Sequence, residues 1–88
     1  MILVHAAKGL VIELAPGPSG RFDRLSVRVG EGDAAAATVL EVSESPGGRL
    51  LVRPAEACGI DELSAVLGAL AANEGRVLPE LRKYNWQR

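Results

Sequence analysis

Residues 63–73 have the sequence LSAVLGALAAN, and these eleven residues contain no charged side chain. The larger apolar residues recur at spacings of three and four, as in a helix with one apolar face: Leu63, Val66, Leu67 and Leu70. The opposite face is small rather than polar and consists of Ala65, Gly68, Ala69 and Ala72. A surface helix of a soluble protein normally carries Lys, Glu or Arg there. The missing solvent face predicts that protein covers both sides of this helix.

The main helix is expected over residues 60–73. Asp61 can accept backbone N–H groups at its start, and Gly75 is a typical residue just beyond a helix end. Pro79 suits the first turn of a second helix, which we expect to be short and to cover residues 77–87. Whether this short helix packs on its own chain or on a neighbour is left open by the sequence.

Upstream of the helix, alternating apolar and polar residues predict five strands of an antiparallel sheet. The expected strands are Ile2–Ala6, Leu10–Leu14, Arg21–Val29, Thr38–Ser43 and Arg49–Arg53. The first two are expected to pair through a three-residue loop, Ala7-Lys8-Gly9, with Ala6 opposite Leu10. An alternative for part of this region is a short helix over Ala34–Val42, because Asp33 before four alanines is also a helix start signal.

This pattern predicts a single α+β domain over residues 1–88, mainly β over residues 1–54, with the main helix packed on one face of the sheet. The expected core residues of the sheet are Ile12, Leu14, Leu25, Val27, Leu40, Val42, Leu50 and Val52. On the outer face of the sheet, a second apolar set is expected at Leu3, Val11 and Leu51.

A chain of 88 residues buries only about 60 to 65 % of its unfolded surface, so the margin of stability is thin. Domains of this size often rely on disulfides, metals or oligomerisation. Cys58 is the only cysteine and His5 the only histidine, so one chain can build neither a disulfide nor the usual zinc cluster. We therefore expect a homodimer in a reducing, cytoplasmic setting, with no metal and no cofactor.

The interface is predicted to use the small helix face together with two of the three aromatic residues. Its predicted members are Ala65, Gly68, Ala69, Ala72, Tyr84 and Trp86. The net charge of −1, from ten basic and eleven acidic residues, gives no overall field toward nucleic acid or anionic lipid. No stretch is apolar for long enough to span a membrane.

Two hypotheses about function follow from these features. The first is a small, non-enzymatic, homodimeric protein-interaction module, because the sequence contains no catalytic set apart from a weak Cys58 and His5 pairing. The alternative is a nucleic-acid-binding protein that uses a sheet-face arginine patch and the basic, aromatic C-terminus. The residues predicted to carry this alternative are Arg24, Arg28, Arg53, Arg82 and Lys83.

Overall fold

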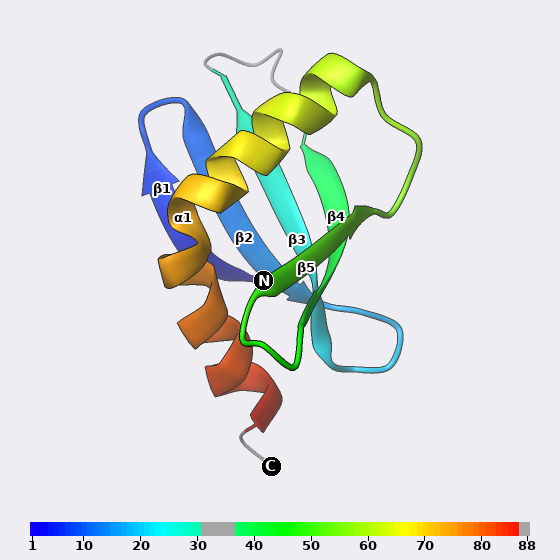
Figure 1. The fold of residues 1–88 in the computed structure, drawn as a ribbon, viewed down its shortest axis with the longest axis vertical. Coiled ribbons are helices and arrows are strands. Elements are labelled where there is room, and N and C mark those ends of the chain that lie inside the picture. Colours follow the sequence, from blue (N-terminus) through cyan, green and yellow to red (C-terminus); the bar gives the residue numbers. More distant parts are fainter. Residues whose placement is uncertain (31–36, 87–88) are drawn as a thin grey trace.

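A computed structural model describes residues 1–30 and 37–86 of the chain, and for Trp86 the backbone alone. Five strands form one antiparallel sheet in the order of the sequence, and a single helix crosses one of its faces (Figure 1). The strands are β1 (Ile2–Ala7), β2 (Leu10–Pro16), β3 (Phe22–Val29), β4 (Thr38–Glu44) and β5 (Leu50–Pro54), and the helix is α1 (Ile60–Trp86). The predicted α+β fold is confirmed.

The β1–β2 hairpin differs from the prediction at its turn. Ala7, not Ala6, pairs with Leu10, so the turn contains only Lys8 and Gly9. Gly9 has a φ of 77°, a conformation that favours glycine. A β-bulge between Leu3 and His5 then shifts the register by one residue. The bulge returns the far end of the hairpin to the predicted pairing, with Ile2 opposite Leu14.

The core lies between the sheet and α1, as the alternation along the strands predicts. The fully enclosed side chains of the sheet are Ile12, Leu14, Leu25, Val27 and Leu40, with Val42 nearly so. Leu50 and Val52 are half-buried and pack against this cluster. Thr38–Glu44 is a strand, so the alternative helix over residues 34–42 is wrong from Thr38 onward; residues 34–36 lie outside the described part.

The helix is one continuous element of 27 residues, which corrects the prediction of a main helix followed by a short one. Gly75 does not adopt the left-handed conformation of a helix end, and α1 continues through Pro79. Proline removes one backbone donor and its ring crowds the preceding turn, which accounts for the change of direction along α1 in Figure 1. Val77, Leu78 and Leu81 are buried on either side of Pro79, so the whole length of the helix packs on the sheet.

Three polar contacts fasten α1 to the sheet. The Glu74 carboxylate accepts the Leu50 backbone N–H at 2.8 Å on the β5 edge. The Arg82 guanidinium donates Nε–H and Nη2–H to the Glu44 carboxylate, both at 2.9 Å. The Asn85 side-chain amide exchanges two hydrogen bonds with the Phe22 backbone, accepting at 2.7 Å and donating at 2.9 Å. These contacts tie the C-terminal half of the helix to β3, β4 and β5.

Among residues 1–30 and 37–86, no helix is both long enough and apolar enough to cross a lipid bilayer.

Candidate functional site

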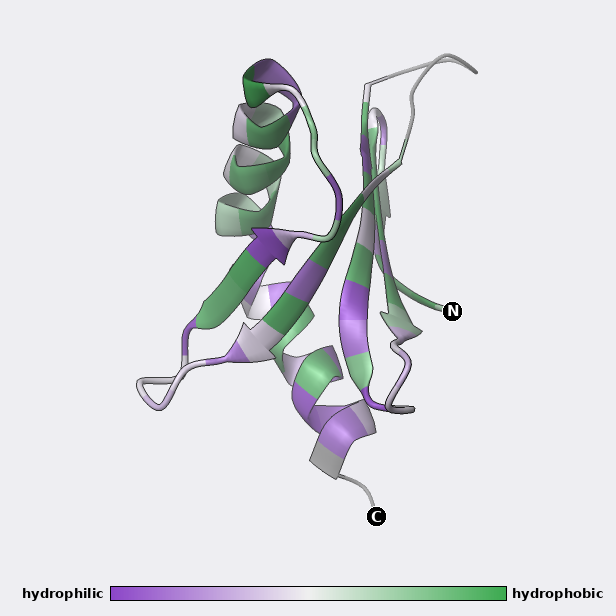
Figure 2. Ribbon diagram, turned by 90° about the vertical axis from the view of Figure 1, so that its right-hand side faces the viewer, coloured by the Kyte–Doolittle hydropathy of each residue, from purple (hydrophilic) through white to green (hydrophobic). Residues whose placement is uncertain are grey.

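The outer face of α1 is the surface on which the sequence prediction of an interface depends. We define it as the residues between Asp61 and Arg76 that point away from the sheet. Ala65, Gly68 and Ala72 are exposed on it, whereas Ala69, at its margin, is half-buried. In Figure 2, α1 is purple at its first turn, green and pale over the turns that follow, and purple again in its C-terminal half. A single copy of the chain therefore leaves an uncharged helix face in water.

One side chain of the predicted core stripe lies at the edge of this face. Leu67 is 39 % exposed, although Val66 and Leu70 beside it are buried. Leu67 lines a cleft of about 160 Å³ between α1 and β5, together with Leu50, Val52 and Ala71. The apolar surface of α1 therefore extends around the helix further than the core requires.

Charged residues return only at the two ends of the outer face. Asp61 and Arg76 are both exposed there. Neither makes an ion pair with any residue that the structure describes. The positions 61, 65, 68, 72 and 76 follow one another at spacings of three or four residues, so all five share one side of the helix. The outer face is thus a strip of small residues with an acid at one end and a base at the other.

The predicted aromatic members of the interface behave differently. Tyr84 is half-buried, and its ring lies 5.3 Å from the ring of Phe22 in the same chain. This contact adds Tyr84 to the core of its own chain. The side chain of Trp86 lies outside the described residues.

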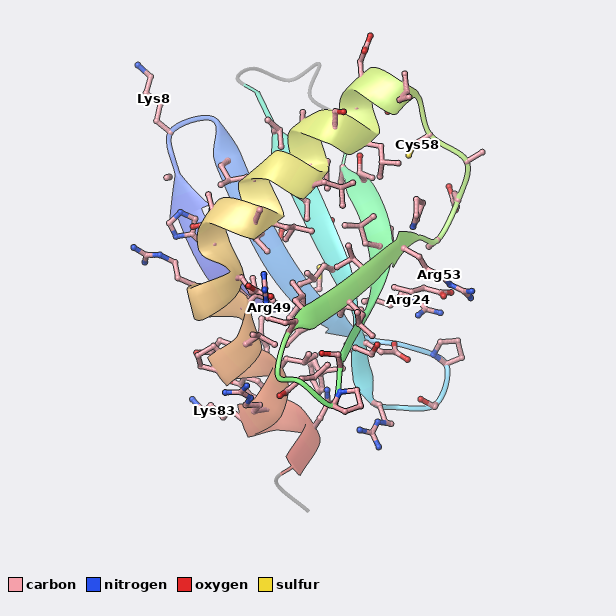
Figure 3. All side chains as sticks on the ribbon, in the orientation of Figure 1. Lys8, Arg24, Arg49, Arg53, Cys58 and Lys83 are labelled. Carbon is pink, nitrogen blue, oxygen red and sulfur yellow. The ribbon has the colours of Figure 1, made fainter. Side chains whose placement is uncertain are left out.

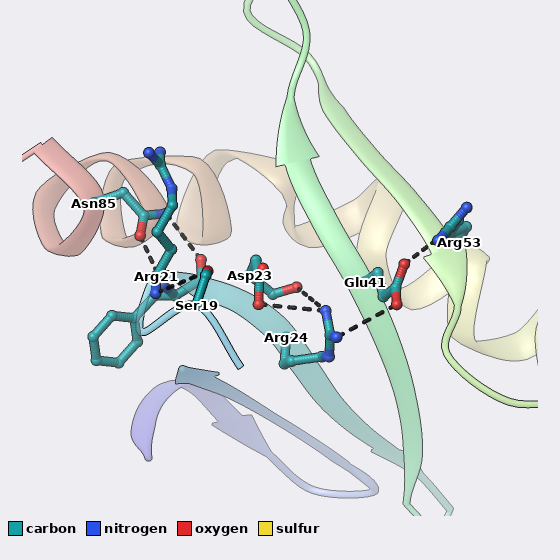
Figure 4. A network of polar contacts seen from close by, with 8 residues as sticks. Ser19, Arg21, Asp23, Arg24, Glu41, Arg53 and Asn85 are labelled. Carbon is teal, nitrogen blue, oxygen red and sulfur yellow. Dashed lines mark hydrogen bonds and ion pairs between the residues drawn. The ribbon is translucent and has the colours of Figure 1, made fainter. Parts of the chain in front are cut away.

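The sheet-face arginines are drawn together by a carboxylate. Glu41 on β4 stands opposite Arg24 on β3 and Arg53 on β5. It pairs with Arg24 at 3.4 Å and with Arg53 at 2.6 Å, and Arg24 also contacts Asp23 at 3.3 Å (Figure 4). Two carboxylates therefore balance the two cations of this row. Such a row has little charge left to hold a phosphate backbone.

The remaining predicted cations are not gathered into the same patch. Arg28 is exposed four residues further along β3 than Arg24, opposite Val11. Arg82 is held by Glu44, and the Lys83 ammonium lies 5.3 Å from the centre of the Tyr84 ring. Figure 3 shows Arg24 and Arg53 beside the sheet and Lys83 on the far half of α1. The structure thus brings Arg24 and Arg53 together but separates Arg28, Arg82 and Lys83 from them.

The carboxylates in these contacts are held in their ionised form. Hydrogen bonds from Arg53 lower the pKa of Glu41, and those from Arg82 lower the pKa of Glu44. The pKa of Glu74 is lowered by its hydrogen bonds from Arg49 and from the Leu50 backbone. A general acid needs a raised pKa to hold its proton near neutral pH. These three carboxylates are therefore suited to ion pairs within the fold and not to proton donation.

The apolar set predicted on the outer sheet face does not form a continuous patch. Leu3 is 60 % exposed on β1 and Leu51 is 50 % exposed on β5, so they lie at opposite edges of the sheet. Val11 between them is half-buried. The outer face of α1 is therefore the more coherent of the two candidate interfaces.

A hollow of about 680 Å³ lies where β3, the end of β4 and the last turns of α1 meet. Its charged and polar lining includes Arg21, Asp23, Glu44, Arg82 and Asn85. Arg82 and Glu44 are bound to each other, and Asn85 is engaged by Phe22. The lining contains two cations and two anions, so it does not favour an ion of either sign.

Sequence reasoning missed Glu74 and Asn85, which fasten the helix to the sheet. Their partners, Leu50 and Phe22, lie 24 and 63 residues away, so no local spacing could have identified these contacts. In the described part of the chain, no group of three or more His, Cys, Asp or Glu side chains is placed to hold a metal ion. Comparison with models of known protein families, with curated proteins and with solved structures finds no match to this chain.

Proposed function

We propose that this protein is a small, non-enzymatic interaction module that works as a homodimer through the outer face of α1. The observation that carries the proposal is the exposure of Ala65, Gly68 and Ala72 on a helix face that has no charge between Asp61 and Arg76 on its outward side. Exposed helix faces of monomers are normally polar. A second copy of the chain would remove this surface from water.

The glycines of the helix support the same proposal. A Cβ added at Gly68 or at Gly75 would meet no atom within 4 Å, and neither residue has a positive φ. Nothing in the packing or the backbone of a single chain therefore requires glycine at these positions. Each glycine nevertheless costs about 1 kcal/mol of helix stability relative to alanine. Close approach of another backbone is a physical reason to keep glycine there.

The non-enzymatic part of the proposal is supported by how the acidic groups are used. Glu41, Glu44 and Glu74 are each bound to an arginine and have a lowered pKa. They serve the fold and are poorly suited to acid catalysis. A cytoplasmic setting fits the single cysteine, Cys58, and forms part of the same proposal.

The test is the mass of the protein in solution at micromolar concentration, measured by light scattering or sedimentation. The wild-type chain is expected to be a dimer. Ala72→Glu places a charge on the outer face and should give a folded monomer, because an exposed substitution changes stability by only about 0.5 kcal/mol.

Ala57→Glu is the matched control, since Ala57 is exposed in the segment before α1 and not on its outer face. It should leave the dimer intact. A wild-type chain that stays monomeric up to high concentration would overturn the proposal, as would Ala72→Glu with an unchanged mass.

A further inference from the structure

The two charged residues that bound the outer face of α1 are placed symmetrically about its smallest residues. Asp61 and Arg76 are separated by 15 positions, and their midpoint falls between Gly68 and Ala69. At about 1.5 Å per residue, each charge lies about 11 Å from that midpoint along the helix. Both are exposed, and neither has an ion-pair partner among the described residues.

We infer that the partner bound at this face is a second copy whose helix runs antiparallel, so that Asp61 of one protomer pairs with Arg76 of its partner. This inference rests on the proposed function and adds the arrangement and two residues that select it. A two-fold axis at the midpoint repeats the pair, giving two ion pairs from one acid and one base.

The same alignment matches the small residues along the strip. An antiparallel pair centred between Gly68 and Ala69 sets Ala65 of one protomer opposite Ala72 of its partner. Gly68 then lies beside the axis, where the two backbones come closest. Small side chains allow helix axes to approach at the lower end of the usual range, about 8 Å. The charges and the sizes therefore select the same register.

A parallel arrangement opposes like charges instead. In it Asp61 would face Asp61 and Arg76 would face Arg76. The two helix dipoles would also run in the same direction, with their positive ends together. Antiparallel packing removes both repulsions, and it places the acidic first turn of one helix near the basic residue of the other.

Other charged groups on α1 do not replace these two. Glu74 points to the sheet edge, where it holds Leu50 and Arg49. Arg82 is bound to Glu44 on β4. Glu62, next to Asp61, is exposed but lies about a quarter-turn around the helix from the outer face. Glu80 and Lys83 lie beyond Arg76, about 17 and 22 Å along the helix from the midpoint, and so outside the strip. Asp61 and Arg76 are therefore the charges that select the arrangement of the two helices.

Charge reversal tests the arrangement. The variants Asp61→Arg and Arg76→Asp should each weaken the homodimer about tenfold or more, because each turns two attractive pairs into two repulsive ones. An equal mixture of the two variants should regain wild-type affinity as a heterodimer, since every cross-pair is then opposite in sign. Native mass spectrometry distinguishes the heterodimer by mass, and sedimentation gives the dissociation constants.

Controls separate this inference from general effects of charge. Glu56→Arg and Arg28→Asp make the same charge changes at exposed positions off the outer face and should leave the dissociation constant unchanged. The double variant Asp61→Arg/Arg76→Asp in one chain restores opposite pairs and should dimerise like wild type. Its recovery would also show that the reversed residues still allow folding, which circular dichroism checks for each variant.

The outcomes are distinct. A wild-type dimer with heterodimer rescue supports the antiparallel arrangement. A wild-type dimer that is indifferent to both reversals overturns the arrangement and leaves the proposed function standing. Preferential pairing of Asp61→Arg with wild type would indicate parallel helices and also overturns it. A monomeric wild-type chain overturns the proposed function and this inference together.

Discussion

Gly68→Ala should stabilise the fold and weaken the assembly. In a single chain, the added methyl group meets no atom within 4 Å, and Gly68 has an ordinary helical backbone. Alanine in place of glycine inside a helix is worth about 1 kcal/mol. In a domain of this size that gain raises the unfolding temperature by about 4 to 8 °C.

The effect on association has the opposite sign. In the proposed antiparallel dimer Gly68 lies beside the two-fold axis, so the substitution adds two methyl groups at the point of closest approach. Overpacking costs about 1 to 3 kcal/mol. Since each 1.4 kcal/mol is a factor of ten, the dissociation constant should rise about 5-fold to 150-fold. One added methyl group per chain would then stabilise the folded monomer and weaken the dimer.

The assay measures both quantities. Thermal unfolding is followed by circular dichroism at a concentration low enough to populate the monomer, because dimerisation itself raises the unfolding temperature. Sedimentation equilibrium gives the dissociation constant. Gly75→Ala is the matched control, as its Cβ also meets no atom within 4 Å but lies about 10 Å along the helix from the axis. It should give a similar thermal gain with a smaller loss of affinity.

Two results would refute the reasoning at different points. An unchanged or lower unfolding temperature of monomeric Gly68→Ala would show that the position is not sterically free in the single chain. An unchanged dissociation constant would show that the helices do not meet at Gly68.

The contacts between α1 and the sheet give two further predictions. Asn85→Ala leaves the N–H and C=O of Phe22 without their partner and should lower the free energy of unfolding by about 1 to 3 kcal/mol, measured by urea denaturation; no loss would show that water replaces the amide. Because its pKa is lowered from 4.5 in the folded state, Glu44 stabilises the protein above that pH and loses this contribution as the pH falls through its folded pKa. The difference in unfolding free energy between wild type and Glu44→Gln should therefore shrink between pH 7 and pH 3, and a constant difference would contradict the ion-pair explanation.

The strands and the core could be predicted because alternation is a local property. Leu25 and Val27 alternate with Arg24 and Ser26, and one face of β3 is buried accordingly. The hairpin register could be predicted only at its far end. The bulge on β1 inserts one residue, and the sequence of a strand does not mark where such an insertion occurs.

The continuity of α1 could not be predicted, because Pro79 and Gly75 are each compatible with a helix boundary and with a helix interior. Proline fits the first turn of a new helix as well as the interior of a helix that tolerates one missing hydrogen bond. The choice depends on distant partners that hold the C-terminal half on the sheet, such as Glu44 for Arg82. Likewise, the sequence predicted Arg24 and Arg53 as one patch with Glu41 in the same region, but only the observed strand register shows that Glu41 pairs with both arginines.

Only the inner face of α1 takes part in holding the fold together, and this matters for how an interface on the outer face would work. The inner face is fixed by buried side chains and by polar contacts at Leu50, Glu44 and Phe22, which occupy three separate places on the sheet. The outer face makes none of these contacts, because Ala65, Gly68 and Ala72 are exposed in the single chain. A partner that docks on the outer face would therefore leave the contacts of the core in place. Substitutions on the outer face should accordingly change the proposed assembly while the fold persists, so that its association and its stability can be measured separately.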